Sequence, residues 1–90
     1  MQIDIRSSFE KDTKKLSNNI KEDIAEALAL MSEAKTLSDI PHLKDMKGAK
    51  KGKKAFRMRI GDYRIWFYLI NESIELVRVL PRKEVYKVFP

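Results

Sequence analysis

The feature that most constrains this chain is a change of hydrophobic pattern after residue 54. Apolar and mainly basic residues alternate over residues 55–60, and two largely apolar runs follow at 63–70 and 74–80. Only the turn residues 61–62 and 71–73 separate these segments. Alternation and short apolar runs bounded by turn residues are typical of β-strands. Strands joined by such short turns are antiparallel neighbours, so the second half of the chain is predicted to be a three-stranded meander.

The first half of the chain is predicted to be mainly helical. Residues 1–6 alternate and predict a short strand. Ser7 with Glu10 three residues later fits a capping box, so we expect a helix to begin at Ser7 and to end near residues 17–19. Asn19 with Glu22 fits the start of a second helix. Its apolar positions recur at helical spacing: Ile20, Ile24, Ala27, Leu28 and Met31.

These elements predict an α+β fold. An N-terminal strand is followed by a two-helix hairpin and the three-stranded antiparallel meander, with the helices on one face of the sheet. Residues 36–54 are predicted to link the hairpin to the meander, because proline at 41 restricts the backbone of Ile40. Within this link, residues 47–54 contain five lysines and two glycines, and we expect a mobile, exposed loop there. We interpret His42, beside the proline, as structural or incidental.

Composition excludes several classes of protein. The 90 residues are 43% hydrophobic, which suits a single domain spanning 1–90 with one core. The absence of cysteine excludes disulfides and thiolate metal sites, and a lone histidine cannot form a multi-histidine site. No apolar run approaches the ~18 residues of a membrane span, and the N-terminus lacks a signal-peptide pattern. We therefore expect a cytoplasmic protein that needs no cofactor or metal and has no membrane partner.

Charge is distributed unevenly along the chain. Residues 1–46 contain 7 basic and 9 acidic residues, whereas residues 47–90 contain 12 and 4. Arg57 and Arg59 are two apart on a predicted strand, so both project from the face opposite the helices. Arg64 begins the next strand and Arg82 follows the third, and antiparallel pairing can bring all four guanidinium groups together. Such a patch suits phosphate and therefore nucleic acid, the alternative being solvated arginines on an exposed sheet face.

Three aromatic residues in this basic half have open roles. Tyr86 lies four residues after Arg82, where it fits base stacking, proton exchange with a ribose hydroxyl, or an ordinary edge position. Trp66 and Tyr68 share a strand face with Arg64. They fit either stacking platforms for bases or packing in the core.

Four segments of the sequence together resemble the RelE/ParE superfamily of toxins from toxin–antitoxin pairs, on the RelE-like side. The strongest is residues 56–65, which contain the R-x-R-x-G-x-Y-R pattern from Arg57 to Arg64. Residues 82–86 are similar to the family's R-x-x-x-Y ending. Residues 7–12 and 43–48 resemble the start of the first helix and the leucine-lysine-glycine segment. The match covers essentially the whole chain.

The resemblance implies a toxin that inhibits translation as a ribosome-dependent, metal-independent messenger RNA endoribonuclease. It implies that the RNA's own 2′-hydroxyl attacks the phosphate and leaves a 2′,3′-cyclic phosphate. By position, it implies five catalytic residues: Arg57, Arg59, Arg64, Arg82 and Tyr86. Since arginine does not act as a general base, Tyr86 or a loop lysine is left to transfer protons. We assign RNA contacts to the lysines around the site: Lys50, Lys51, Lys53, Lys54 and Lys83.

The resemblance also implies a protein partner. Toxins of this family are held by a cognate antitoxin, so we expect a heteromeric toxin–antitoxin complex as well as contacts with messenger RNA and the ribosome. We expect a helical antitoxin segment to place an apolar face on this domain and acidic residues near Arg57 and Arg82. Two alternatives stay open: a ParE-like toxin that inhibits DNA gyrase, and a non-catalytic nucleic-acid-binding module.

Overall fold

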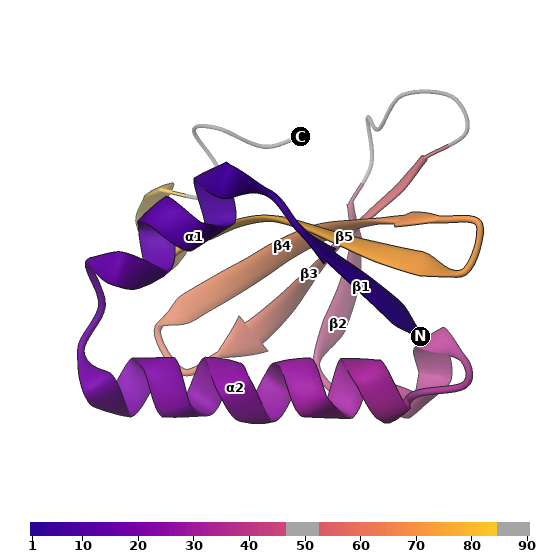
Figure 1. Cartoon of the computed structure of the whole chain (residues 1–90), viewed down its shortest axis with the longest axis horizontal. Coiled ribbons are helices and arrows are strands. Elements are labelled where there is room, and N and C mark those ends of the chain that lie inside the picture. Colours follow the sequence, from indigo (N-terminus) through magenta and orange to yellow (C-terminus); the bar gives the residue numbers. More distant parts are fainter. Residues whose placement is uncertain (47–52, 85–90) are drawn as a thin grey trace.

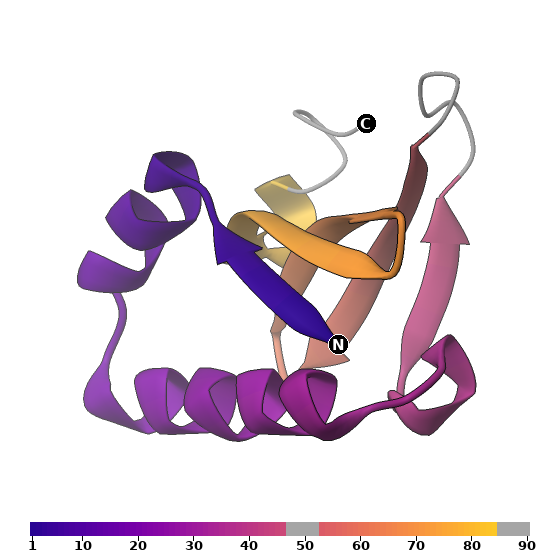
Figure 2. The same cartoon turned by 45° about the vertical axis from the view of Figure 1, so that its right-hand side comes forward.

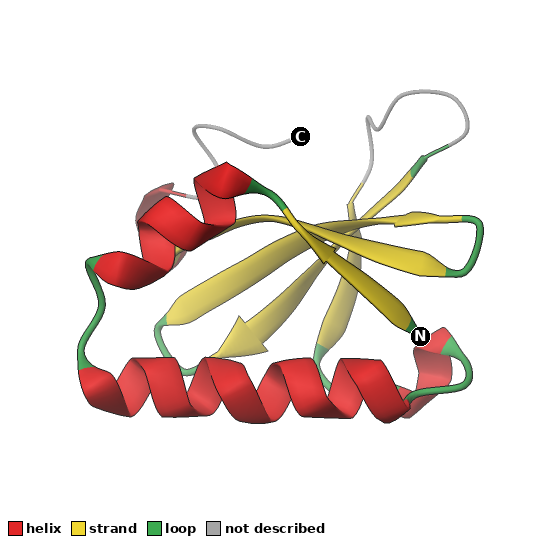
Figure 3. Cartoon of the chain, viewed as in Figure 1, coloured by secondary structure: helices red, strands yellow, loops and turns green. Residues whose placement is uncertain are grey.

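The computed structural model describes residues 1–46 and 53–84 (Figure 1). Its elements in chain order are β1 (Gln2–Ile5), α1 (Ser7–Lys14), α2 (Asn18–Glu33), the 3₁₀ helix η1 (Leu37–Asp39), β2 (Leu43–Met46), β3 (Lys54–Ile60), β4 (Tyr63–Ile70) and β5 (Ser73–Pro81). The described strands form one sheet in the order β1-β5-β4-β3-β2, with the helices packed around it (Figure 3). The predicted α+β class is confirmed.

The predicted meander is confirmed as β3, β4 and β5. β3 pairs antiparallel with β4, and β4 pairs antiparallel with β5. Gly61, in the first turn, has a φ of 55°, a backbone conformation that glycine adopts without steric cost. Asn71 and Glu72, in the second turn, have φ values of 47° and 67°. Two consecutive positive φ angles match the right-handed twist of the flanking strands, which explains why two residues suffice for this turn.

The segment predicted as a link contains an additional strand, β2, at one edge of the sheet (Figure 2). β2 pairs antiparallel with β3, placing Leu43 opposite Met58 and Met46 opposite Ala55. The sequence pattern places these residues in the link and predicts no strand there. A four-residue strand carries too short an alternation to be recognised, and its hydrogen bonds depend on the exposed edge of β3. Residues 47–52 of the predicted loop lie outside the described residues.

At the other edge of the sheet, β1 runs parallel to β5, with Ile3 opposite Ile74. α1 then covers the rest of the β5 edge. The Ser8 hydroxyl donates a hydrogen bond to the Val77 carbonyl, and the Asp12 carboxylate accepts one from the Val79 backbone N–H at 3.0 Å. β1 pairs with β5 only as far as Leu76. Beyond that point, side chains of α1 form hydrogen bonds with the backbone groups of β5 that would otherwise lack a partner strand.

Both helices form where the pattern predicts, but their caps differ from the prediction. α1 begins at Ser7, yet its N-cap is Arg6, whose backbone N–H is held by the Leu76 carbonyl of β5 at 3.0 Å. Ser7 is therefore already helical and no capping box forms there. The N-cap of α2 is Ser17, whose hydroxyl accepts a hydrogen bond from the Ile20 backbone N–H. No helix in the described ranges has the length and apolar character needed to cross a membrane.

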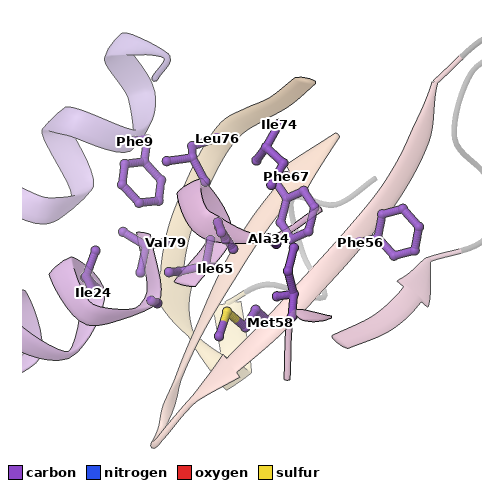
Figure 4. Close-up of a cluster of buried hydrophobic side chains, with 13 residues drawn as sticks. Phe9, Ile24, Ala34, Phe56, Met58, Ile65, Phe67, Ile74, Leu76 and Val79 are labelled. Atoms are coloured by element: carbon purple, nitrogen blue, oxygen red, sulfur yellow. The ribbon is translucent and has the colours of Figure 1, made fainter. Parts of the chain in front are cut away.

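The main core lies between the helices and one face of the sheet (Figure 4). Phe9 of α1 and Ile24 of α2 are buried against strand residues, and the rings of Phe56 and Phe67 stack at 5.7 Å between centroids. The remaining buried members from the helices and their flanks are Ala27, Met31, Ala34 and Ile40, and those from the strands are Met58, Ile65, Ile74, Leu76 and Val79. The expectation that the helices cover one sheet face is thus confirmed.

The opposite face of the sheet has a smaller apolar cluster of its own. Ala55, Trp66 and Leu80 are buried there, with Met46 and Tyr68 partly buried against them. Trp66 is only 3% exposed, which decides its open role in favour of packing. This cluster supports the floor of the face that carries the arginines.

Candidate functional site

The strand register places the arginines of β3 and β4 beside one another. Arg59 is directly opposite Arg64, and Arg57 lies between Trp66 of β4 and Lys44 of β2. Like charges directly opposite on a sheet are destabilising. The sequence therefore places cations where fold stability does not favour them, which is typical of a site that binds an anion.

These side chains surround an open hollow of about 340 Å³. Its described lining consists of His42, Leu43, Lys44, Arg57, Arg59 and Arg64. Four of these six residues are cationic and none is acidic. The structure therefore brings together three of the four arginines predicted to share a patch, and it adds Lys44 and His42 from β2 and the residue before it.

The turn between β3 and β4 holds the Arg64 guanidinium. Its Nη1 donates hydrogen bonds to the carbonyl oxygens of Gly61, at 2.8 Å, and Tyr63, at 2.9 Å. Two anchored bonds restrict a side chain that otherwise has many rotamers. Arg64 is therefore presented to the hollow in a restricted orientation.

Arg59 contacts His42 through both backbone and side chain. The Arg59 backbone N–H donates to the His42 carbonyl at 3.1 Å, and Arg59 Nη2 lies 3.4 Å from His42 Nδ1. His42 has a φ of 60°, in the left-handed region that histidine adopts more readily than most residues. Sequence reasoning missed His42 and Lys44, because both lie in or beside the unrecognised strand β2.

Arg82 does not line the hollow described above. It follows β5 at the start of a helical turn over residues 82–84, and its side chain is exposed. Its backbone N–H donates to the Asp62 carbonyl at 3.0 Å, so Arg82 lies beside the same β3–β4 turn that holds Arg64. Tyr86 lies outside the described residues.

The predicted RNA-binding lysines are only partly described. Lys54 begins β3 and Lys83 follows β5, and both are exposed. The Lys53 ammonium lies 5.3 Å from the centroid of the Tyr68 ring, and the Arg6 guanidinium lies 5.6 Å from it. Both distances fit cation–π contacts. Lys50 and Lys51 lie outside the described residues.

A second hollow, of about 390 Å³, is apolar and lies between α1, α2 and the end of β1. Its lining includes Ile5, Phe9, Ile24 and Leu28, and Ile5 is 47% exposed. The rest of its lining consists of the basic Lys14 and Lys21, the acidic Glu10, Thr13 and Ala25. Its chemistry differs from that of the arginine hollow, so it suits an apolar partner surface.

Two charged groups have shifted pKa values in this fold. The Asp12 carboxylate accepts hydrogen bonds from Arg78 at 2.7 and 3.0 Å and raises the pKa of that guanidinium above its ordinary value. Backbone N–H groups of Lys35 and Thr36 donate to Asp39 and lower the pKa of its carboxyl group. Neither Arg78 nor Asp39 belongs to the described lining of the arginine hollow.

Comparisons with known proteins agree with this architecture. Toxin RelE3 of Methanocaldococcus jannaschii is 30% identical over 90 residues, which cover 100% of both proteins. A chain of the RelB–RelE antitoxin–toxin complex from Methanococcus jannaschii has a TM-score of 0.78 at 28% identity, with 97% of this chain and 99% of that chain covered. A chain of the archaeal RelE–RelB complex from Pyrococcus horikoshii OT3 shares the fold at a TM-score of 0.74 and 17% identity, covering 90% and 93%.

The family resemblance drawn from the motifs is confirmed at the level of the whole chain. Residues 3–86 match the family described as the ParE toxin of the type II toxin–antitoxin system parDE. This match and the full-length similarity to a RelE toxin agree with the basic sheet face and the helices behind it. The chain therefore belongs to the RelE/ParE superfamily of type II toxin–antitoxin toxins.

Proposed function

We propose that this toxin is a ribosome-dependent endoribonuclease that cuts messenger RNA in the cytoplasm without a metal ion. The observation that carries the proposal is the hollow in which Arg57, Arg59 and Arg64 converge. A phosphodiester under attack gains negative charge on its non-bridging oxygens. Fixed guanidinium groups around that position stabilise the transition state more than the ground state.

The proposed reaction uses the RNA's own 2′-hydroxyl. Its oxygen attacks the adjacent phosphorus, the bond to the 5′-oxygen breaks, and the products carry a 2′,3′-cyclic phosphate and a 5′-hydroxyl. Arginine remains protonated at any ordinary pH, so the arginines act as electrostatic groups and do not accept the proton. We assign Arg82 to the same phosphate and Tyr86 to the ribose, where it stacks or, as the phenolate, accepts the proton of the 2′-hydroxyl.

Basic residues around the hollow support contacts with the rest of the RNA. Lys54, at the start of β3, and Lys83, in the helical turn after β5, are exposed. Lys53 lies against Tyr68 on the same sheet face as the arginines. With Lys50 and Lys51, they are our proposed contacts to flanking phosphates. Such contacts add affinity without sequence information, which suits a nuclease that takes its position from the ribosome.

The proposal is tested by adding purified toxin to translating ribosomes and mapping the 5′ ends on the message. We expect discrete cuts that depend on translation, and none with the Arg57→Ala, Arg59→Ala double variant. The family match to ParE toxins supports one specific alternative function, the inhibition of DNA gyrase. Intact message together with trapped gyrase–DNA cleavage complexes would favour that alternative, and RNA binding without either effect would indicate a non-catalytic module.

We also propose that a cognate antitoxin forms a heteromeric complex with this toxin. The similar solved structures include antitoxin–toxin complexes. The apolar hollow between α1 and α2 can bind the apolar face of a helix whose flanks carry acidic residues near Lys14 and Lys21. Ala25→Arg, within that hollow, should weaken the complex at least about tenfold by placing a charge in an apolar contact. Glu26→Arg, the neighbouring position outside the lining, is the control. Equal affinity of both variants would move the antitoxin to another surface.

A further inference from the structure

His42 is the one histidine in the described lining of the arginine hollow. The other charged residues facing it are Lys44 from β2, Arg57 and Arg59 from β3, and Arg64 from β4. Arginine and lysine side chains ordinarily stay protonated up to pH 10 or above, whereas a histidine changes charge between about pH 5 and pH 8. Proton exchange within this lining therefore falls to the imidazole.

The contact with Arg59 gives that imidazole two alternative partners. In the structure, Arg59 Nη2 lies 3.4 Å from His42 Nδ1, and a guanidinium is always the donor. A hydrogen bond in this contact therefore requires Nδ1 to be the acceptor, which is the geometry of a ring with its proton on Nε2. A bound phosphate attracts the Arg59 guanidinium through stronger, charge-assisted hydrogen bonds. Once Arg59 turns to the phosphate, Nδ1 is released and the added negative charge favours the imidazolium.

We propose that His42 takes up a proton when an RNA phosphate enters the hollow and gives that proton to the leaving 5′-oxygen. The inference rests on the proposed ribonuclease function and names the group that completes its chemistry. The bond from O2′ to phosphorus forms as the bond from phosphorus to O5′ breaks, and its electron pair goes to O5′. The imidazolium of His42 protonates O5′, while the 2′-hydroxyl proton goes to water. His42 returns to the neutral form and again accepts from Arg59.

The anchored backbone of His42 supports this role. Its carbonyl is held by the Arg59 backbone N–H at 3.1 Å, so the imidazole stays within reach of the hollow while the Arg59 side chain moves. The side chain is exposed, so solvent can supply the proton on binding. A histidine held by its backbone and open to solvent suits proton exchange better than an inert structural position.

Proton uptake is tested by binding alone. The probe is a single-stranded oligonucleotide of deoxyribose residues, which cannot be cleaved through a 2′-hydroxyl and keeps its phosphate charge across the range. Affinity of the wild-type toxin should rise by up to tenfold per unit of falling pH, between about pH 8 and pH 5. His42→Asn keeps a residue suited to the left-handed backbone conformation and should flatten this dependence. Equal slopes for the two proteins would overturn the uptake by His42.

Proton donation is tested by cleavage in the ribosomal assay with two substrates. His42→Asn should slow cleavage of ordinary RNA by about 10²–10⁴-fold, the usual contribution of a general acid. The same variant should cut RNA with sulfur in place of the 5′-bridging oxygen nearly as fast as the wild-type toxin does, because a thiolate leaves without a proton. A merely structural defect would slow both substrates equally and overturn the assignment. Wild-type toxin that cuts neither substrate would instead contradict the ribonuclease function itself, while the binding slopes would still decide proton uptake.

Discussion

Asp12 of α1 and Arg78 of β5, 66 positions apart in the chain, form an ion pair through two hydrogen bonds of 2.7 and 3.0 Å. The same carboxylate also accepts the Val79 backbone N–H at 3.0 Å. One side chain therefore closes the edge of β5 and neutralises a cation on the strand next to the arginine hollow. Arg78 is thereby a structural arginine.

Because of this ion pair, we expect substitution of Asp12 to lower the stability of the fold while leaving the arginine hollow in place. Asp12→Ala leaves the Val79 N–H and the Arg78 guanidinium without this acceptor, so we expect a loss of about 1–3 kcal/mol in the free energy of unfolding. Asp12→Asn keeps a carbonyl acceptor for the backbone N–H and should lose less. Urea unfolding of the three proteins measures both differences. A stability of Asp12→Ala within about 0.5 kcal/mol of wild type would contradict the structural role.

We expect Asp39 to make a pH-dependent contribution to the free energy of unfolding. Hydrogen bonds from the Lys35 and Thr36 backbone N–H groups lower the pKa of its carboxyl group below 3.8 in the folded state. A lowered folded pKa means that the stabilisation is complete above pH 3.8 and is lost as the pH falls through the folded pKa. Asp39→Ala should thus be less stable than wild type at pH 7, with the difference shrinking in acid. Thermal unfolding between pH 7 and the acid limit of folding measures this, and a constant difference would count against it.

The parts of the fold that follow from local patterns were predictable. β3 to β5 have alternating or apolar runs joined by two-residue turns, so their pairing needs no information from elsewhere in the chain. β2 has only four residues and forms because β3 offers it an edge. The parallel pairing of β1 with β5 also depends on where the two helices return the chain.

The site shows the same division between local and long-range information. Arg57, Arg59 and Arg64 were predictable from strand alternation and a short turn. His42 was not, because its approach to Arg59 depends on the β2–β3 pairing. Arg78 resembles the site arginines in sequence, and only the distant Asp12 gives it a different role.

We expect Arg82→Ala to abolish toxicity while the protein still folds. Its side chain is exposed, and the described contact with Asp62 uses its backbone N–H, which alanine keeps. If the guanidinium stabilises the transition state, Arg82→Ala should slow cleavage by about 10²–10³-fold. Lys83→Ala, at the adjacent exposed position, should have a much smaller effect. Growth after induced expression and circular dichroism of the purified variants are the measurements, and unchanged growth arrest by a folded Arg82→Ala toxin would remove Arg82 from the mechanism.

The cationic hollow predicts that RNA binding weakens steeply with salt. Roughly four to five phosphate contacts on single-stranded RNA give a slope near −3 in a plot of log affinity against log salt, at about 0.7 per contact. Binding of a non-cleavable oligonucleotide between about 50 and 200 mM salt measures the slope. Removing Arg57 should reduce its magnitude by about one contact, whereas Lys11→Ala, on α1, should leave it unchanged. A flat dependence would remove phosphate recognition from the proposed function.

The last prediction concerns the nucleophile. The carboxylates of the basic half of the chain are Asp62, Glu72, Glu75 and Glu84, and none lines the arginine hollow. In residues 1–46 and 53–84, no three histidine or carboxylate groups lie close enough together to hold a metal ion. A two-metal mechanism needs several carboxylates converging on the scissile phosphate. We therefore expect the arginines to supply the electrostatic stabilisation and the 2′-hydroxyl to attack.

A message with a single 2′-deoxyribose at the mapped cut site tests this directly. Cleavage there should fall below detection, while cuts at unmodified sites in the same message serve as the internal control. The 3′ end left by wild-type cleavage should be a cyclic phosphate, which phosphatase removes only after acid opens the ring. Because ribosomes themselves need magnesium, chelation does not separate the two mechanisms, whereas the deoxy substitution removes only the proposed nucleophile. Undiminished cutting at the deoxy position would mean that water attacks and that the group activating it is still to be found.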